Sequence, residues 1–519
     1  MYYISIRIKK GYPYMRKTSN NWGGTREGAG RKTLLRKKKA TQVYLDPELK
    51  KQIEYIEIDK CINLSQKCSY LIEKGLKHMT NSTTVENNNT FKTSDNLKTA
   101  TKTVKYIDLF SGLGGTRMGF ENALKKLGFE GSSVFVSEIK KHAIESYSKN
   151  FPEDTISGDI TKIDAKDIPD FDFLLAGFPC QAFSSAGNRL GFEDTRGTLF
   201  FDIARIIKEK NPKGFLLENV EGLVSHDNGK TLTVIINTLE ELGYHVSYKI
   251  LNGKDFGLAQ FRNRIYITGS IKQTVDLENL PVKHKKLYSV IENNVAPEES
   301  DFANKLLSHF TIDEIIGKQI KDKRGGDSNI HSWEFELKGE VSKDQKELLG
   351  LLLKQRRNKK WGPIIGIEWM DGMPLTIEMI KTFYSHNNLQ EMLDDLVNKG
   401  YLTYEHPKKK VGNRRVYDET LEKGYNIITG KLSFKYSKIL DPNDITPTLV
   451  ATDISKLAVP VQGGIRPLTI REGLRLFGFP EDYQLDHIQT TKAYDLLGNT
   501  VCVPVIEEVS KKLLESTYL

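Results

Sequence analysis

Residues 104–115 read Val-Lys-Tyr-Ile-Asp-Leu-Phe-Ser-Gly-Leu-Gly-Gly, and this stretch decides the fold of the 519-residue chain. The apolar run from Val104 to Phe110 predicts a buried strand, and a helical pattern begins at about Thr116. The glycines between them allow backbone amides to approach a ligand at a strand-to-helix turn. A glycine-rich turn can also simply close a tight loop, so the stretch alone predicts only a strand, a turn and a helix.

The alternation of an apolar run with a helical pattern, first seen at residues 104–115, continues along the chain. Short apolar runs at 134–136, 171–176 and 215–217 alternate with amphipathic stretches as far as Gly269. This alternation is typical of an α/β domain with a mostly parallel sheet. We therefore expect residues 104–269 to form one α/β domain.

Carboxylates follow two of the predicted strands. Glu138 follows the strand that ends near Val136, where a carboxylate can accept hydrogen bonds from the ribose hydroxyls of a nucleoside. Asp159 follows the next strand region and could accept from an adenine amino group. Together with the glycines, these groups predict a nucleoside pocket at the carboxyl edge of the sheet. The alternative is that they are ordinary surface carboxylates.

Cys180 lies in the loop Gly-Phe-Pro-Cys-Gln that follows the strand at 171–176. An isolated cysteine is most often a small buried side chain or an inert thiol. Here Pro179 stiffens the loop, and the loop opens into the same crevice as the predicted nucleoside pocket. Cys180 is therefore a candidate nucleophile.

With these motifs the chain resembles the cytosine-5 DNA methyltransferases. The resemblance lies in motifs that occur in the family's order: the glycine turn at 108–119, Pro179-Cys180-Gln181, Glu218-Asn219-Val220, Gln260-Phe261-Arg262-Asn263-Arg264, the segment 466–483 and Gly498-Asn499-Thr500-Val501. The resemblance implies a Rossmann-like S-adenosylmethionine-dependent methyltransferase sheet with a smaller target-recognition domain. The cofactor would then be S-adenosyl-L-methionine, bound by Phe110, Gly112, Gly114, Gly115, Glu138, Asp159, Ile160, Pro179, Asn499 and Val501.

The resemblance also assigns catalytic roles. The thiolate of Cys180 would add to carbon 6 of cytosine, which turns carbon 5 into a nucleophile. Glu218 would share a proton with ring nitrogen 3, and Arg262 and Arg264 would stabilise the adduct. Without the resemblance, the two arginines would be read as exposed side chains of a strand. Because the target base must leave the duplex, further DNA contacts are expected at Gln181, Ser184, Thr448 and Leu449.

The chain that follows residue 269 divides into two parts at Arg466. Residues 270–465 are the expected target-recognition domain, with a winged-helix-like insert predicted from helical patterns at 375–384 and 388–399 and a hairpin that starts at Tyr401. Two basic runs, 354–360 and 408–415, are expected to contact phosphates. Residues 466–519 would return to the catalytic domain.

The N-terminal part reads as a separate small module. We expect a flexible basic arm at 1–39, a ribbon-helix-helix-like DNA-binding module at 40–79 and a polar linker at 80–103. In that module Gln42 and Tyr44 would face bases, and the module would make a homodimer that could regulate transcription of its own gene. The alternative is a small helical module that binds a different partner or none.

Composition sets the remaining limits. The net charge of +9 suits a polyanionic partner such as duplex DNA. The four cysteines show no metal-type clustering, so we expect neither a metal site nor a disulfide framework. No apolar run approaches the roughly 20 residues of a membrane span, which predicts a soluble, cytoplasmic protein without a membrane partner.

Three functions stay open at this point. The favoured function is a DNA cytosine-5 methyltransferase of a bacterial restriction-modification system, with a cognate restriction endonuclease as functional partner. One alternative is an RNA cytosine-5 methyltransferase built on the same motifs, which would not need the long region before Arg466. The other is a DNA-binding regulator without catalysis, which would not need the intact set Cys180, Glu218, Arg262 and Arg264.

Overall fold

The structure, a computed structural model, describes residues 102–179, 199–326, 328–412, 414–429 and 434–518. These residues all belong to one compact unit, Thr99–Leu519. The basic arm, the ribbon-helix-helix-like module and nearly all of the linker predicted within residues 1–103 lie outside the described residues. So do Cys180, Gln181 and Ser184.

A seven-stranded mixed sheet forms the first half of the described chain. Its strands, in the spatial order β3-β2-β1-β4-β5-β7-β6, are β1 (Thr103–Leu109), β2 (Glu130–Ser137), β3 (Ile156–Ser157), β4 (Phe173–Gly177), β5 (Gly214–Val220), β6 (His245–Asn252) and β7 (Asn263–Ser270). Neighbours from β3 to β5 are parallel, whereas β7 is antiparallel to both β5 and β6. The predicted Rossmann-like α/β class is confirmed.

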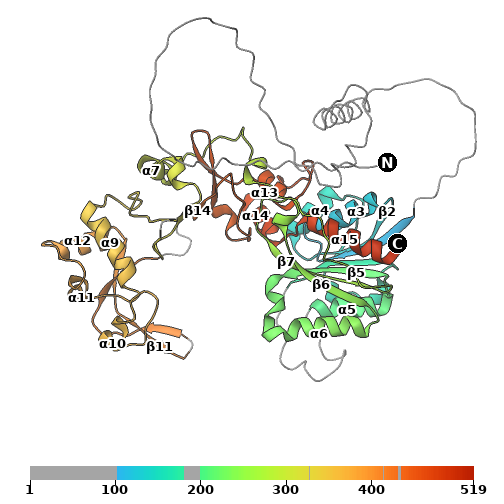
Figure 1. Cartoon of the computed structure of the whole chain (residues 1–519), viewed down its shortest axis with the longest axis horizontal. Coiled ribbons are helices and arrows are strands. Elements are labelled where there is room, and N and C mark those ends of the chain that lie inside the picture. The colour runs from blue at the N-terminus through green and yellow to red at the C-terminus, as the bar shows by residue number, and fades with distance from the viewer. Residues whose placement is uncertain (1–101, 180–198, 327, 413, 430–433, 519) are drawn as a thin grey trace, which may run out of the picture. The chain divides into compact units, whose positions relative to one another are not determined.

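Helices cover both faces of this sheet (Figure 1). On one side lie α3 (Gly115–Lys126), α4 (Lys141–Asn150) and α15 (Val503–Tyr518), and on the other α5 (Leu199–Lys210) and α6 (Lys230–Glu241). Neighbouring side chains of a strand point to opposite faces of the sheet. Tyr106 therefore packs in the core beneath α3, α4 and α15, and Ile107 packs in the core beneath α5 and α6. Burial on both faces explains why these strands read as nearly continuous apolar runs.

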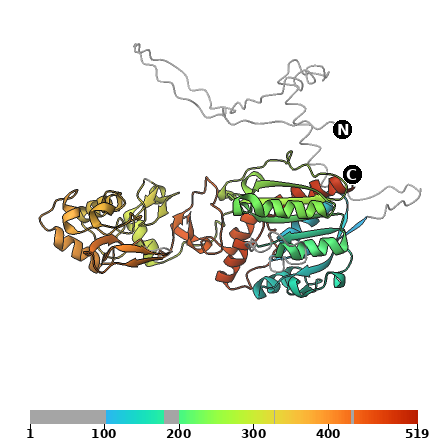
Figure 2. The same cartoon turned by 90° about the horizontal axis from the view of Figure 1, so that it is seen from below.

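The C-terminal helix α15 packs against α3, at the opposite end of the described sequence (Figures 1 and 2). Gly119 on α3 makes this approach possible, because a Cβ atom at that position would lie 2.6 Å from the Cβ of Ile506 and 2.8 Å from the carbonyl oxygen of Val503. Val509 and Leu513 of α15 belong to the same core as Tyr106. The last segment of the chain therefore helps to build the first sheet.

A second, five-stranded sheet lies in the later half of the chain. Its order is β16-β15-β14-β8-β9, formed by β8 (Gln319–Ile320), β9 (Asn329–Ile330), β14 (Lys438–Ile439), β15 (Leu457–Val461) and β16 (Gly464–Pro467). Helices α7 (Asp301–His309) and α8 (Ile312–Ile315) pack on it through Phe302 and Ile315. Helices α13 (Ile470–Phe477) and α14 (Thr490–Asn499) then lead to α15.

Between β9 and β14 the chain forms an insert with its own core around Leu349, Leu393 and Ile427. Its elements are α9 (Lys343–Gln355), α10 (Trp361–Ile365), α11 (Ile377–Lys381), α12 (Leu389–Asn398), β10 (Leu402–Glu405), β11 (Lys408–Val411), β12 (Arg414–Tyr417) and β13 (Gly424–Ile427). The helix predicted at 375–384 is shorter than expected, because α11 covers only Ile377–Lys381. In addition, β10 pairs with β13, so the basic residues between them form a separate hairpin, β11-β12.

No helix in the part of the chain that the structure describes is long and apolar enough to cross a membrane.

Candidate active site

A cavity of about 290 Å³ lies where β1, β2, β4 and β5 end. Parallel strands present their carboxyl ends at one sheet edge, which is why residues far apart in sequence meet there. The predicted site residues that line it are Phe110, Gly112, Glu138, Asp159, Ile160, Pro179, Glu218, Arg262, Arg264 and Asn499. The lining residues to which the sequence prediction gave no role include Ser137, Ile139, Phe178, Asn219 and Thr500.

The glycine turn after β1 has a left-handed backbone at three positions. Phe110, Gly112 and Gly114 have φ values of 56°, 53° and 74°. At Gly114 a Cβ atom would also lie 2.5 Å from the ring of Phe151, so only glycine fits there. The turn thereby brings the Gly112 backbone to the cavity wall.

Gly115 and Val501 do not line the cavity but pack against each other beside it. A Cβ atom on Gly115 would lie 2.9 Å from Cγ2 of Val501, which is buried. This close contact joins the glycine turn to the last predicted motif. The structure therefore brings the two ends of the catalytic sequence together.

The Glu138 carboxylate is held in a fixed orientation at the end of β2. Its Oε2 accepts from the backbone N–H of Gly112 at 2.9 Å, and its Oε1 accepts from the N–H groups of Ile139 and Lys140 at 2.7 and 2.8 Å. Since a carboxylate oxygen can accept two hydrogen bonds, Oε2 keeps capacity for a ligand hydroxyl. This geometry fits the predicted contact to a ribose.

Asp159 and Ile160 form the next part of the wall. Asp159 accepts from the hydroxyl and N–H of Thr161, at 2.7 and 3.1 Å, and these hydrogen bonds hold the pKa of its carboxyl below the usual value. The buried Ile160 supplies an apolar surface. An apolar surface beside a fixed carboxylate and a glycine turn fits a nucleoside cofactor such as S-adenosylmethionine.

Glu218, at the end of β5, forms an ion pair with Arg264 on β7. Nε of Arg264 lies 3.1 Å from Oε1 of Glu218, and both side chains are largely buried. Burial raises the pKa of Glu218, while the positive charges of Arg264 and Arg262 oppose that rise. The antiparallel pairing of β5 with β7 explains the contact, because it places Val220 opposite Arg264 and brings both motifs to one edge.

Asn219, the residue after Glu218, connects β5 to the loop that follows β4. Its side-chain amide donates to the carbonyl oxygen of Phe178 at 2.9 Å, and its Oδ1 accepts from the N–H of Val220 at 2.8 Å. Asn219 is buried, so this hydrogen bond is shielded from water. The sequence prediction quoted the Glu-Asn-Val motif but gave Asn219 no role.

Arg262 is buried and donates to main-chain carbonyls from two distant segments. Its Nη1 lies 2.8 Å from the oxygen of Leu449, and its Nη2 lies 3.1 and 2.8 Å from those of Gly498 and Thr500. Burial lowers the pKa of Arg262. The side chain thus holds the cavity wall together, and its predicted role in stabilising the adduct stays a prediction.

Thr448 and Leu449, two of the predicted DNA-contacting residues, lie beside Gln260 and Phe261. The Thr448 hydroxyl donates to the carbonyl of Phe261 at 2.8 Å, and Oε1 of Gln260 accepts from the N–H of Leu449 at 3.2 Å. The Leu449 side chain is fully buried, whereas the neighbouring Val450 is exposed. DNA contacts by Thr448 and Leu449 stay predictions.

Asp108 lies fully buried near the end of β1, and neither of its carboxylate oxygens has a hydrogen bond of normal geometry. Burial raises the pKa of Asp108 to about 8, although the nearby Arg117 opposes the rise. The Asp108 carboxyl is therefore largely protonated at neutral pH.

Comparisons with known proteins show the family that the chain is similar to. Residues 104–515 match the family model described as C-5 cytosine-specific DNA methylase. The chain is 59% identical over 420 residues to Type II methyltransferase M.NlaIV of Neisseria lactamica, and 57% identical over 420 residues to Type II methyltransferase M.NgoBV of Neisseria gonorrhoeae. Each match covers 80% of this chain and 99% of the relative. A crystal structure of the S. pombe Dnmt2 methyltransferase has a TM-score of 0.42 at 18% identity, over 80% of this chain and 100% of that one.

Proposed function

Because the chain belongs to the C-5 cytosine-specific DNA methylases, we propose that it transfers a methyl group from S-adenosylmethionine to carbon 5 of a cytosine in a specific duplex DNA sequence, through a covalent adduct with Cys180. The observation that carries the proposal is the buried Glu218–Arg264 pair at the cavity. It lies beside Asn219, which is hydrogen-bonded to the loop that leads to Cys180.

The ring of cytosine must be activated before carbon 5 can attack a methyl group. The Cys180 thiolate adds to carbon 6, and a proton shared between Glu218 and ring nitrogen 3 neutralises the charge that develops there. Burial favours the protonated form of Glu218, which suits it to this role. A base then takes the proton from the methylated carbon 5, ring nitrogen 3 returns the shared proton to Glu218, and the bond between sulfur and carbon 6 breaks to restore the Cys180 thiolate.

The cofactor supplies an electrophilic methyl group when bound. Glu138 would hold its ribose, Asp159 its adenine amino group, and Ile160 and Phe110 would form the apolar walls of the pocket. Since a base within a duplex exposes neither face to a thiol, the target cytosine must rotate out of the stack into the cavity.

We further propose that the methylation protects DNA within a Type II restriction-modification system. The relatives M.NlaIV and M.NgoBV, which share more than half of their residues with this chain, are named Type II methyltransferases. A restriction endonuclease that cleaves the same sequence would be the functional partner. The N-terminal module at 40–79 would bind DNA as a dimer through Gln42 and Tyr44 and regulate transcription.

The test is methyl transfer from radiolabelled S-adenosylmethionine to duplex DNA and to transfer RNA, with the full chain and its Cys180→Ser variant. The proposal predicts label on carbon 5 of DNA cytosine that is lost in the variant. Label on RNA alone would support the RNA methyltransferase instead. Label on neither nucleic acid, from a chain that still binds DNA, would support the regulator.

A duplex with 5-fluorocytosine at the methylated position tests the covalent step separately. Fluorine cannot leave carbon 5 as a proton does, so the adduct should persist on Cys180 and appear as a mass increase of the peptide that contains it. An intact duplex released without adduct, from an enzyme that methylates ordinary DNA, would contradict the nucleophilic role of Cys180.

A further inference from the structure

The two basic runs of the insert differ in how their cations are used. In the first run, 354–360, Arg356 is buried and donates to Oδ1 of Asn426 at 2.6 Å and to the carbonyl of Ile427 at 3.3 Å. Arg357 pairs with Asp371 at 2.6 Å. These arginines hold the insert together and are not available to a ligand.

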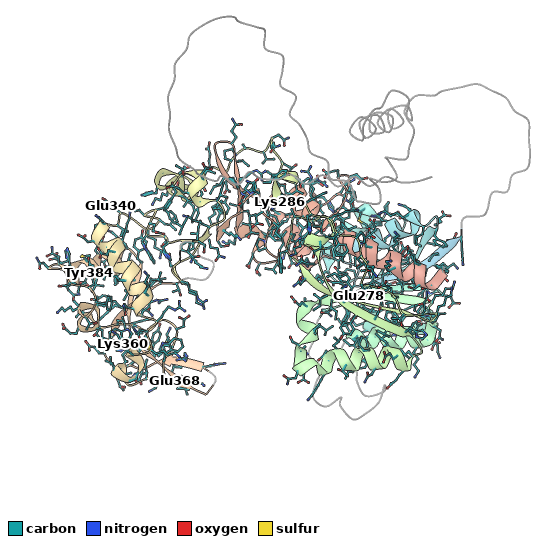
Figure 3. All side chains as sticks on the ribbon, in the orientation of Figure 1. Glu278, Lys286, Glu340, Lys360, Glu368 and Tyr384 are labelled. Atoms are coloured by element: carbon teal, nitrogen blue, oxygen red, sulfur yellow. The ribbon has the colours of Figure 1, made fainter. Side chains whose placement is uncertain are left out.

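Two of the three lysines of the first run lie over tryptophan rings. Nζ of Lys360, labelled in Figure 3, lies 4.2 Å from the ring centre of Trp361, and Nζ of Lys359 lies 5.7 Å from that of Trp369. Cations over aromatic rings stabilise the local fold. Most of the charge of this run is therefore explained by internal contacts.

The second run forms the basic hairpin, which we define as β11 and β12 (Lys408–Val411 and Arg414–Tyr417). Lys410, Arg414 and Arg415 are exposed, and none of them has an ion-pair partner among the residues that the structure describes. Lys409 pairs with Asp418 at 3.2 Å, and Lys408 lies over the ring of Tyr417 at 4.5 Å. Three cations of the hairpin thus remain free.

The placement of these free cations does not serve the stability of the hairpin. Lys410 is paired directly opposite Arg415 in the register, and like charges at such positions repel. No third described strand pairs with β11 or β12, so the two-stranded ribbon gains little to offset this repulsion. A polyanion that binds along the hairpin would remove it.

The helix α12 has the opposite charge. Glu391 and Asp394 are exposed on it, Asp395 is half-buried, and the amide of Gln390 is hydrogen-bonded to Asp394 and to Tyr425. In a winged-helix arrangement α12 would be the helix that enters the major groove. Its acidic surface is unsuited to the phosphates on either side of a groove.

We propose that the basic hairpin is a wing that binds the phosphates of duplex DNA through Lys410, Arg414 and Arg415, and that α12 does not contact DNA. This inference rests on the proposed function, since it assigns a binding surface for the same substrate. The wing strengthens binding to any duplex, and the choice of sequence lies elsewhere in the chain.

The test compares the full chain with a variant that carries Lys410→Gln, Arg414→Gln and Arg415→Gln. The matched control carries Lys272→Gln, Lys323→Gln and Lys343→Gln, which remove the same charge from exposed positions of the same half of the chain, outside both basic runs. Binding is measured by fluorescence anisotropy over a salt series, with one duplex that the wild-type enzyme methylates and one that it does not.

The hairpin variant should bind both duplexes about tenfold or more weakly, and its plot of log affinity against log salt should be shallower by about 2 to 3 units. Its kcat at saturating DNA should match the wild type, and its thermal unfolding midpoint should equal or slightly exceed that of the wild type, because the repulsion between Lys410 and Arg415 is removed. Equal affinity and salt dependence in variant and wild type would overturn the proposal. So would an equal loss in the control.

The two hypotheses fail in distinguishable ways. If the wild-type chain transfers no methyl group to any duplex, the proposed function fails, whatever the hairpin does in the binding assay. If the wild type methylates DNA and the hairpin variant has an unchanged KM for that DNA at every salt concentration, only the wing is excluded.

Discussion

The side-chain amide of Asn219 donates a 2.9 Å hydrogen bond to the carbonyl oxygen of Phe178, so the end of β5 holds the loop that leads to Cys180. Replacing Asn219 with Asp keeps the acceptor for the N–H of Val220 but removes the donor to Phe178. We predict that kcat for DNA methylation falls about 100-fold, because a small displacement of a nucleophile costs that much. The KM for S-adenosylmethionine should change much less than kcat, because Glu138, Asp159 and Ile160, which would hold most of the cofactor, lie on other segments.

Asn122→Asp is the matched control for this prediction. Asn122 also donates from its amide, to Glu507 at 3.2 Å, but it lies on α3 and does not line the cavity. The control should keep its kcat. An equal loss of kcat in both variants would mean that the Asn219 effect is not specific to the loop.

Arg264→Gln should lower kcat/KM about 100-fold, the usual cost of removing one group that stabilises charge in an active site. Arg264 also opposes the rise in the pKa of Glu218, so its removal raises that pKa further. If protonated Glu218 is the active form, the alkaline limb of the kcat/KM profile should move to higher pH. A limb that moves to lower pH would contradict this role of Glu218.

Arg262→Ala should act mainly on stability. The substitution leaves three buried carbonyl oxygens, of Leu449, Gly498 and Thr500, without their donor. We expect the free energy of unfolding to fall by about 3 kcal/mol or more. Urea unfolding measures this, with Arg264→Gln as the comparison. A fully stable Arg262→Ala variant without activity would instead place Arg262 among the catalytic groups.

Gly498→Ala should disrupt the cavity wall. A Cβ atom there would lie 2.1 Å from the backbone nitrogen and 2.5 Å from the Cα of Ala451, and backbone atoms cannot move aside cheaply. We expect a loss of about 2 kcal/mol or more in the free energy of unfolding. Gly350→Ala on α9 is the control: its Cβ would meet nothing within 4 Å, so that variant should be slightly more stable.

Asp108→Asn should remove a pH dependence of stability. The pKa of Asp108 is about 8 in the folded chain and 3.8 without burial, so between those values the folded state binds one proton more than the unfolded state. Its contribution to stability is complete below pH 4 and is lost as the pH rises through 8. The slope is about 1.4 kcal/mol per pH unit.

Urea unfolding of wild type and Asp108→Asn between pH 5.5 and 8.5 tests this directly. The difference in unfolding free energy between the two chains should move steadily in favour of the variant as the pH rises. A constant difference across this range would show that the Asp108 carboxylate stays ionised when buried.

The sequence alone was sufficient for the α/β class and for the family. Val104, Tyr106, Ile107 and Leu109 are apolar because β1 is buried on both faces, and this local signal survives in any tertiary context. The order of the motifs around Cys180, Glu218 and Arg264 led to the same family as the match over residues 104–515. The predicted strand ends also placed Glu138 and Asp159 in one pocket, since parallel strands end at one edge, and both line the cavity together with Glu218.

The tertiary structure decided what each arginine does. Arg262 and Arg264 are equivalent by motif, yet one donates to the carbonyls of Leu449, Gly498 and Thr500 while the other pairs with Glu218. The two basic runs also look alike in sequence, and only the fold shows that Arg356 is buried whereas Arg415 is free. The sequence gives the charge of each side chain, but its partners lie on segments that are distant in the sequence, and only folding brings them together.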